Sequence, residues 1–246
     1  MISRPTASAV LGASALALTL LLVGCTADGP PAARPTEQAT PAATPSLSAP
    51  ATIGTSATAM GSQLDVHAAP GGGVTQTLAN PQASGAPLTL LVVETQGDWL
   101  QVALAQRPNG STGWVRSDSV VQHSLVYSLE ASTTQNTLTL RENGRPVKTY
   151  PAATGTGGTP TPHGSFYLTE LLEPTNEGYG PYAFGLSAFS DVLSDFGGGP
   201  GQIGLHGTDD EASIGQSASH GCIRLSNADI TELAGLLPLG TPITIS

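Results

Sequence analysis

The chain has 246 residues, more than one ordinary domain needs, so one or two domains with additional non-globular segments are expected. Apolar residues make up 39%, enough for a packed core, while 30 glycines, 20 prolines and only 4% aromatic residues favour short strands and turns over long helices. The formal net charge of -10 repels phosphate backbones and argues against nucleic acid as a partner.

The N-terminus has the features of an export signal. Arg4 precedes an apolar run over residues 9–23, which is shorter than the roughly 20 residues of a membrane-spanning helix. The Leu-Val-Gly-Cys sequence ending at Cys25 resembles the lipobox of bacterial lipoproteins, whose cysteine receives a diacylglyceryl group. The alternative is an ordinary signal peptide in which Cys25 is incidental. The resemblance predicts a signal peptide over residues 1–24 and a protein anchored to the cell membrane through lipidated Cys25, on its extracytoplasmic side and facing the cell wall.

Residues 25–58 are rich in Ala, Pro, Thr and Ser and predict a disordered tether. Residues 59–122 contain several short strand signals separated by turn residues, which predicts a small barrel. The expected strands cover residues 64–66, 88–95, 99–104 and 112–116. The Gly-Asp-Trp-Leu-Gln-Val stretch from Gly97 and the Thr-Gly-Trp-Val-Arg stretch from Thr112 resemble bacterial SH3-like domains attached to cell-wall enzymes.

Residues 123–246 again indicate mainly strands. Asn143-Gly144 between two strand signals is the strongest hairpin signal in the chain. One helix is expected after Ser226, since Ser-Asn-Ala-Asp fits a capping box and the apolar residues that follow lie on one face. The expected strands cover residues 125–129, 138–142, 145–150, 164–169, 182–187, 202–205 and 242–245.

The residues with the clearest chemistry surround Cys222, in Ser-His-Gly-Cys-Ile-Arg-Leu. If Cys25 is lipidated, Cys222 is the remaining thiol and cannot form an internal disulfide, so chemistry explains it better than simple packing. A thiol needs a base to become a good nucleophile, and both His206 and His220 are available in the sequence. Gly221 allows a tight turn whose amides, with that of Cys222, could form an oxyanion hole.

These motifs resemble the signature of L,D-transpeptidase catalytic domains of the YkuD type. Ser-His-Gly-Cys-Ile-Arg-Leu around Cys222 carries the resemblance, together with His-Gly-Thr from His206, Thr-Pro-His-Gly-Ser-Phe from Thr161 and Gly-Thr-Pro-Ile from Gly240. The resemblance implies a β-sandwich with one short helix over residues 123–246, a mainly β chain overall, and no cofactor or metal. The implied roles are Cys222 as nucleophile, His206 as general base, Gly207 carbonyl as the group that orients His206, His220, Arg224 and Gly221 in the substrate site, and Ser219 as support for the loop.

The family's reaction is the cross-linking of peptidoglycan stem peptides through a cysteine acyl-enzyme, and its members are also acylated by carbapenems. A hydrolase (carboxypeptidase) using the same acyl-enzyme and an inactive wall-binding lipoprotein are the alternatives. A metal site of His206, His220 and Cys222 with an aspartate matches no familiar zinc spacing. A papain-like hydrolase would place its cysteine upstream of its histidine, the reverse of the order seen here. Arg224 could bind a substrate carboxylate or pair with a nearby acid.

Overall fold

The computed structural model describes residues 53–196 and 198–246. The predicted signal peptide, Cys25 and most of the predicted tether lie outside those residues. Within them, no helix is long and apolar enough to cross a membrane.

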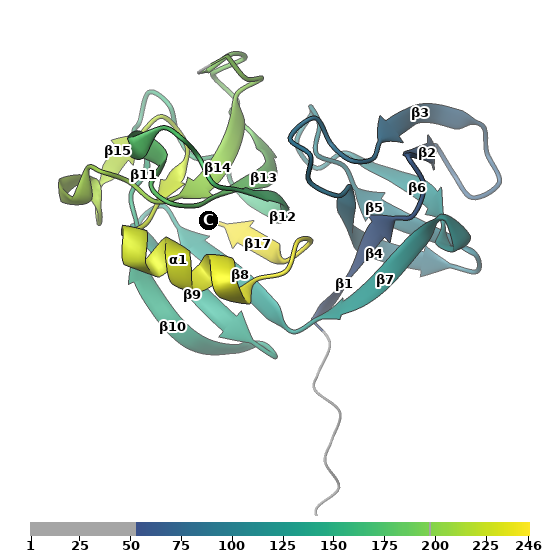
Figure 1. Ribbon diagram of the computed structural model, residues 1–246, viewed down its shortest axis with the longest axis horizontal. Coiled ribbons are helices and arrows are strands. Elements are labelled where there is room, and N and C mark those ends of the chain that lie inside the picture. Colours follow the sequence, from purple (N-terminus) through teal and green to yellow (C-terminus); the bar gives the residue numbers. More distant parts are fainter. Residues whose placement is uncertain (1–52, 197) are drawn as a thin grey trace, which may run out of the picture. The chain divides into compact units, whose positions relative to one another are not determined.

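The first sheet is antiparallel and precedes Tyr127 in the chain (Figure 1). Among the described residues its strand order is β3-β2-β6-β5-β4-β1-β7. Its inward-facing positions alternate along β5, where Leu100 and Val102 are buried, as expected for a sheet with one packed face. The elements are β1 (Gly54–Ala59), β2 (Gln63–His67), β3 (Val74–Ala79), β4 (Thr89–Gln96), β5 (Trp99–Ala103), β6 (Thr112–Arg116), the 3-10 helix η1 (Ser117–Ser119) and β7 (Val120–Leu125).

This sheet extends past both boundaries drawn from the sequence. Strand β1 begins at Gly54, so residues 54–58 belong to the sheet rather than to the predicted tether. Those residues lack the large apolar side chains that indicate a strand. Between β4 and β7, however, small side chains such as Ala57 fit, and Ala57 is fully buried. At the other end β7 continues to Leu125, beyond the predicted boundary at residue 122.

The second sheet holds the motifs around Cys222. In the described part of the chain its order is β10-β9-β8-β17-β12-β13-β14-β16, and β11 and β15 form a separate parallel pair. Its elements are β8 (Tyr127–Ser132), β9 (Thr137–Glu142), β10 (Arg145–Pro151), β11 (Thr154–Gly155), β12 (Gly164–Leu172), η2 (Glu177–Tyr179), β13 (Ala183–Phe189), β14 (Gln202–His206), η3 (Glu211–Ser213), β15 (Ser217–Ser219), β16 (Ile223–Arg224), α1 (Asn227–Leu236) and β17 (Pro242–Ile245).

Two local signals produce their expected structures. Asn143 and Gly144 both have positive φ, 51° and 77°, which is the turn that an Asn-Gly hairpin adopts. Ser226 caps α1, since its Oγ accepts a hydrogen bond from the Asp229 amide at 3.1 Å. The prediction of a mainly β chain with one α-helix is confirmed for the described residues.

The packing of the second sheet's core determines which residues of β14 face the cavity. Helix α1 contributes Ile230 and Leu233, both fully buried in the cluster that also contains Leu205 of β14. Because side chains alternate along a strand, Gly204 and His206 face the other way, toward a cavity. The helix and the apolar core therefore fix the strand that presents the candidate site.

Candidate active site

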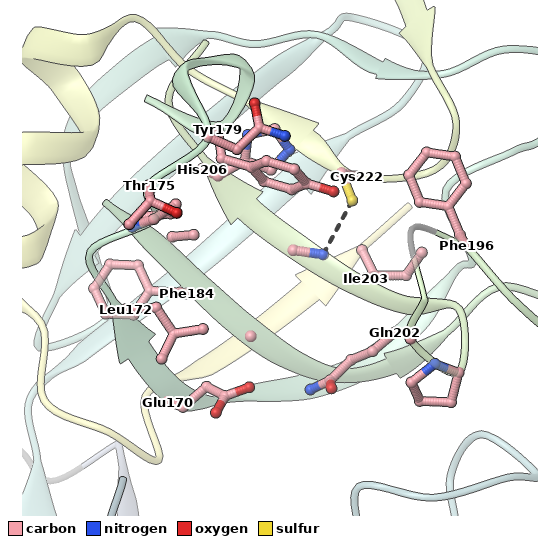
Figure 2. Close-up of a pocket in the computed structure, with 17 residues that line it drawn as sticks. Glu170, Leu172, Thr175, Tyr179, Phe184, Phe196, Gln202, Ile203, His206 and Cys222 are labelled. Carbon is pink, nitrogen blue, oxygen red and sulfur yellow. Dashed lines mark hydrogen bonds between the residues drawn. The ribbon is translucent and has the colours of Figure 1, made fainter. Parts of the chain in front are cut away.

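Cys222 lies beside β14 because β14 and β16 pair in parallel. Leu205 is opposite Ile223, and His206 is opposite Arg224. This register brings Cys222, immediately before β16, next to Gly204, whose amide donates a hydrogen bond to Cys222 Sγ at 3.3 Å (Figure 2). If Gly204 were replaced by alanine, its Cβ would lie 3.8 Å from Cys222 Sγ and 3.5 Å from His206 Cδ2. The thiol and the imidazole therefore both border the space next to Gly204.

His206 is held in a defined orientation. Its side chain is 3% exposed, and its Nδ1 lies 2.5 Å from the Gly207 carbonyl oxygen. Since a carbonyl oxygen only accepts, Nδ1 carries the proton and donates, and Nε2 is left as the proton acceptor. The role predicted for Gly207 requires this contact.

Burial keeps both reacting groups neutral before substrate binds. Burial lowers the pKa of His206 to about 4. The hydrogen bond to Gly207 raises this pKa in part, and the positive charge of Arg224 lowers it slightly further. Burial also raises the pKa of the Cys222 thiol, which the Gly204 amide and Arg224 partly offset. At neutral pH the site thus holds a thiol and a free base rather than a preformed ion pair, so proton transfer accompanies attack.

Ser219 braces the turn that carries Cys222. Its Oγ donates to the Cys222 carbonyl oxygen at 2.6 Å and accepts from the Gly221 amide at 3.1 Å. Gly221 has φ +118°, and a Cβ there would approach Ile203 Cδ1 to 3.1 Å. The turn therefore requires glycine. The Gly221 amide is already engaged with Ser219, which leaves the Cys222 amide as the better candidate for an oxyanion donor.

The other two residues predicted from the motif lie at the edges of the site. His220 is exposed, and its ring stacks on Phe196 with centroids 5.2 Å apart. The Arg224 guanidinium is 3.9 Å from an Asp210 carboxylate oxygen, and its buried Nε has no hydrogen-bond partner among the described residues. The described residues contain no group of three His, Cys, Asp or Glu side chains arranged to hold a metal ion.

A cavity of about 460 Å³ opens onto the thiol and the imidazole (Figure 2). Its walls include residues that the motif did not identify, from the two loops that flank β13. Tyr179, in the loop after β12, lies over His206 with ring centroids 4.6 Å apart. Phe196, in the loop between β13 and β14, lines the other side. The predicted strands indicated only that loops join here, and no sequence spacing placed these aromatic rings.

The loop that carries Phe196 is held by hydrogen bonds from two side chains that lie between β5 and β6 of the first sheet. Arg107 donates three hydrogen bonds to it, and Asn109 exchanges a pair of hydrogen bonds with the Phe189 backbone, accepting at 2.9 Å and donating at 2.8 Å. The acceptors of Arg107 are the carbonyl oxygens of Pro200 (2.6 Å), Ser190 (2.8 Å) and Leu193 (2.9 Å). The first sheet therefore supports one wall of the cavity.

We expect Asn109→Ala to raise the KM for a substrate that binds in this cavity and to lower the free energy of unfolding by about 1–3 kcal/mol, since it leaves two backbone groups of Phe189 without partners. Steady-state kinetics and urea unfolding measure both effects. Asn80→Ala is the matched control, because the Asn80 side chain also bonds backbone groups with both ends of its amide, within the first sheet. It donates to the Ala59 and Gly61 carbonyl oxygens and accepts from the Leu88 amide. An equal rise in KM in both variants would contradict a specific role for the Asn109 contact.

Comparison with known proteins identifies the family. The family model for the L,D-transpeptidase catalytic domain, YkuD, matches residues 127–245. The chain is 35% identical over 149 residues to the L,D-transpeptidase YkuD of Bacillus subtilis, covering 58% of this chain and 84% of that protein. It is 36% identical over 123 residues to YkuD of Bacillus licheniformis, covering 50% of this chain and 67% of that protein.

A solved structure of L,D-transpeptidase 3 from Mycobacterium tuberculosis, in complex with a faropenem-derived adduct, is 16% identical with a TM-score of 0.44. The match covers 57% of this chain and 76% of that one. The family match, by contrast, spans the whole region that holds Cys222, His206 and the cavity. The chain belongs to the YkuD family of L,D-transpeptidase catalytic domains and is an L,D-transpeptidase.

Proposed function

We propose that this enzyme cross-links peptidoglycan stem peptides through a thioester on Cys222. The observation that carries the proposal is the joint position of the Cys222 thiol and the oriented, neutral imidazole of His206 on one cavity. Nucleophilic acyl transfer needs a base beside the thiol, and the imidazole of His206 is such a base. Its other nitrogen is hydrogen-bonded to the Gly207 carbonyl, which fixes the orientation of the ring.

In the first half-reaction, Cys222 Sγ attacks the carbonyl of the third, diamino-acid residue of a tetrapeptide while His206 Nε2 takes the thiol proton. The negative charge passes to the carbonyl oxygen, which the Cys222 amide stabilises, with Gly221 shaping the turn. Collapse of this intermediate breaks the amide bond to terminal D-alanine, whose nitrogen receives the proton from His206. The products are free D-alanine and a Cys222 thioester.

In the second half-reaction, the side-chain amine of another stem attacks the thioester and His206 accepts its proton. The new amide is the cross-link, and the proton returns to the Cys222 sulfur. Water in place of the amine would give the hydrolase alternative with the same intermediate. His220 and Phe196 would border the donor stem at the exposed rim, and Arg224 would face a carboxylate of the substrate.

The parts of the chain before the catalytic domain favour an enzyme that acts at the cell wall. We infer that the first sheet is an SH3-like domain, from the sequence motifs around Trp99 and Trp114, and that Cys25 is lipidated and holds the enzyme at the outer face of the membrane. From the resemblance of the motif around Cys222, we infer that carbapenems acylate Cys222 in this chain.

The decisive experiment incubates the purified chain with a tetrapeptide and analyses the products by mass spectrometry. We expect release of D-alanine, a thioester on the wild-type protein, and cross-linked dimers when a second stem is present. Cys222→Ala should abolish all three. Release of D-alanine without dimers would favour the carboxypeptidase, and an intact fold without any thioester would favour an inactive wall-binding protein.

A further inference from the structure

A row of paired residues crosses the cavity floor from a carboxylate to the thiol. Glu170 on β12 is opposite Gly185 on β13, and Gly185 is opposite Gly204 on β14, whose amide contacts Cys222 Sγ. All four residues line the cavity, and Figure 2 shows Glu170 and Cys222 at opposite ends of it. Gly185 and Gly204 place no side chain between Glu170 and Cys222 along this row.

The Glu170 side chain lies over Gly185 on this floor. A Cβ on Gly185 would lie 2.8 Å from Glu170 Oε1, whereas a Cβ on Gly204 would lie 3.8 Å from the sulfur. Opposed Cβ positions in an antiparallel pair are about 5 Å apart, so the carboxylate and the thiol are separated by on the order of 10 Å. This gap fits one extended side chain lying across the two glycines.

The carboxylate has no protein counterpart. Among the described residues that line the cavity, Glu170 is the one carboxylate, and no Lys, Arg or other described side chain forms an ion pair or a hydrogen bond with it. Glu170 is half-buried at the cavity wall, so its carboxylate is accessible to a group that enters the cavity. A cationic group of the substrate would supply the missing partner.

We propose that Glu170 binds the side-chain ammonium of the donor stem, on the same diamino acid whose carbonyl Cys222 attacks. This inference rests on the proposed function. A lysine-type amine stands at the end of a four-carbon stem, which can lie over Gly204 and Gly185 and reach the carboxylate. An ammonium–carboxylate contact is a charge-assisted hydrogen bond, stronger than a neutral one.

The amine of the acceptor stem does not fit this position. An attacking nitrogen must come within about 3–3.5 Å of the thioester carbon, which is bonded to the sulfur. The Glu170 carboxylate is too far away to hold that nitrogen during attack. The geometry therefore assigns Glu170 to recognition of the donor in the first half-reaction.

The test compares two donor tetrapeptides, one with lysine at the third position and one with norleucine, which lacks the amine. D-Alanine release is measured with the wild-type full chain and with Glu170→Gln. For the lysine peptide, we expect Glu170→Gln to lower kcat/KM about 10- to 100-fold, mainly through KM, because a charged hydrogen bond is lost. The loss for the norleucine peptide should be several-fold smaller.

The matched control is Glu173→Gln, the same chemical change at an exposed carboxylate that does not line the cavity. It should not change the ratio of the two peptides. Equal losses for both peptides with Glu170→Gln would overturn the proposal and assign Glu170 to the structure of the floor. No loss with either peptide would overturn it as well.

Calorimetric binding of both peptides to Cys222→Ala, with and without Glu170→Gln, separates this proposal from the proposed function. Preference for the lysine peptide that disappears with Glu170→Gln would support the ammonium site even if turnover failed. Turnover of both peptides by wild type, with no preference that depends on Glu170, would leave transpeptidation standing and remove the ammonium site.

Discussion

His206→Asn is expected to slow acylation of Cys222 by about 10²- to 10⁴-fold, the usual loss when a general base is removed. The thiol is neutral in the free enzyme because burial raises its pKa, so little thiolate exists to attack without a base. Stopped-flow or mass-spectrometric rates of carbapenem acylation measure this loss directly. Asparagine can still donate toward the Gly207 carbonyl, which keeps the fold of the site comparable.

His163→Asn is the matched control for this prediction. His163 contacts Thr133 at 2.9 Å and does not line the cavity, so the same substitution there should leave the acylation rate unchanged. The acylation rate of the wild-type protein should persist as the pH falls from 7 toward about 4. The pKa of His206 lies at about 4, so the imidazole remains a free base down to that pH. A rate that changed only a few-fold in His206→Asn would mean that the imidazole is not the base.

The motif around Cys222 and the local signals of the second sheet were readable from sequence because each acts over a few residues. The Asn143-Gly144 turn and the Ser226 cap depend only on their neighbours, and both form as expected. The neighbourhood of His206 and Cys222 follows from one long-range fact, the parallel pairing of β14 and β16. No local signal in the sequence indicated that pairing, since residues 223–224 were not among the expected strands.

The walls of the cavity could not be derived in this way. Tyr179 reaches His206 because the next residue, Gly180, has φ +64° and lies very close to Gly207. A Cβ on Gly180 would lie only 2.6 Å from Gly207 Cα, so no larger residue fits there. This contact joins two loops that are far apart in the sequence, and no local signal around either glycine predicts it. The same holds for Asn109, whose contact with Phe189 links the two sheets.

Strand β1 shows a different limit. Its Gly-Thr-Ser-Ala-Thr-Ala sequence has the composition of the preceding Ala/Pro/Thr-rich segment, so pattern alone assigned it to the tether. What makes it a strand is its place between β4 and β7, which both offer it hydrogen-bond partners. Tertiary context here overrides weak local preference.

The buried imidazole of His206 should also make the protein sensitive to acid. Folding lowers the pKa of His206 from 6.5 to about 4, so the folded state binds this proton less well than the unfolded chain. The resulting stability is fully present above pH 6.5 and is lost as the pH falls toward 4. Over that interval the shift corresponds to about 3 kcal/mol of unfolding free energy.

The measurement is urea unfolding of wild type and His206→Asn near neutral pH and near pH 4. Wild type should lose about 3 kcal/mol more than the variant between the two conditions, because carboxylates titrate alike in both proteins and cancel in the difference. Equal losses would show that His206 keeps an ordinary pKa in the fold. In that case the imidazole would be partly protonated near neutral pH, and acylation should weaken well above pH 4. The stability curve and the rate profile therefore test one property, the neutral buried base, by independent means.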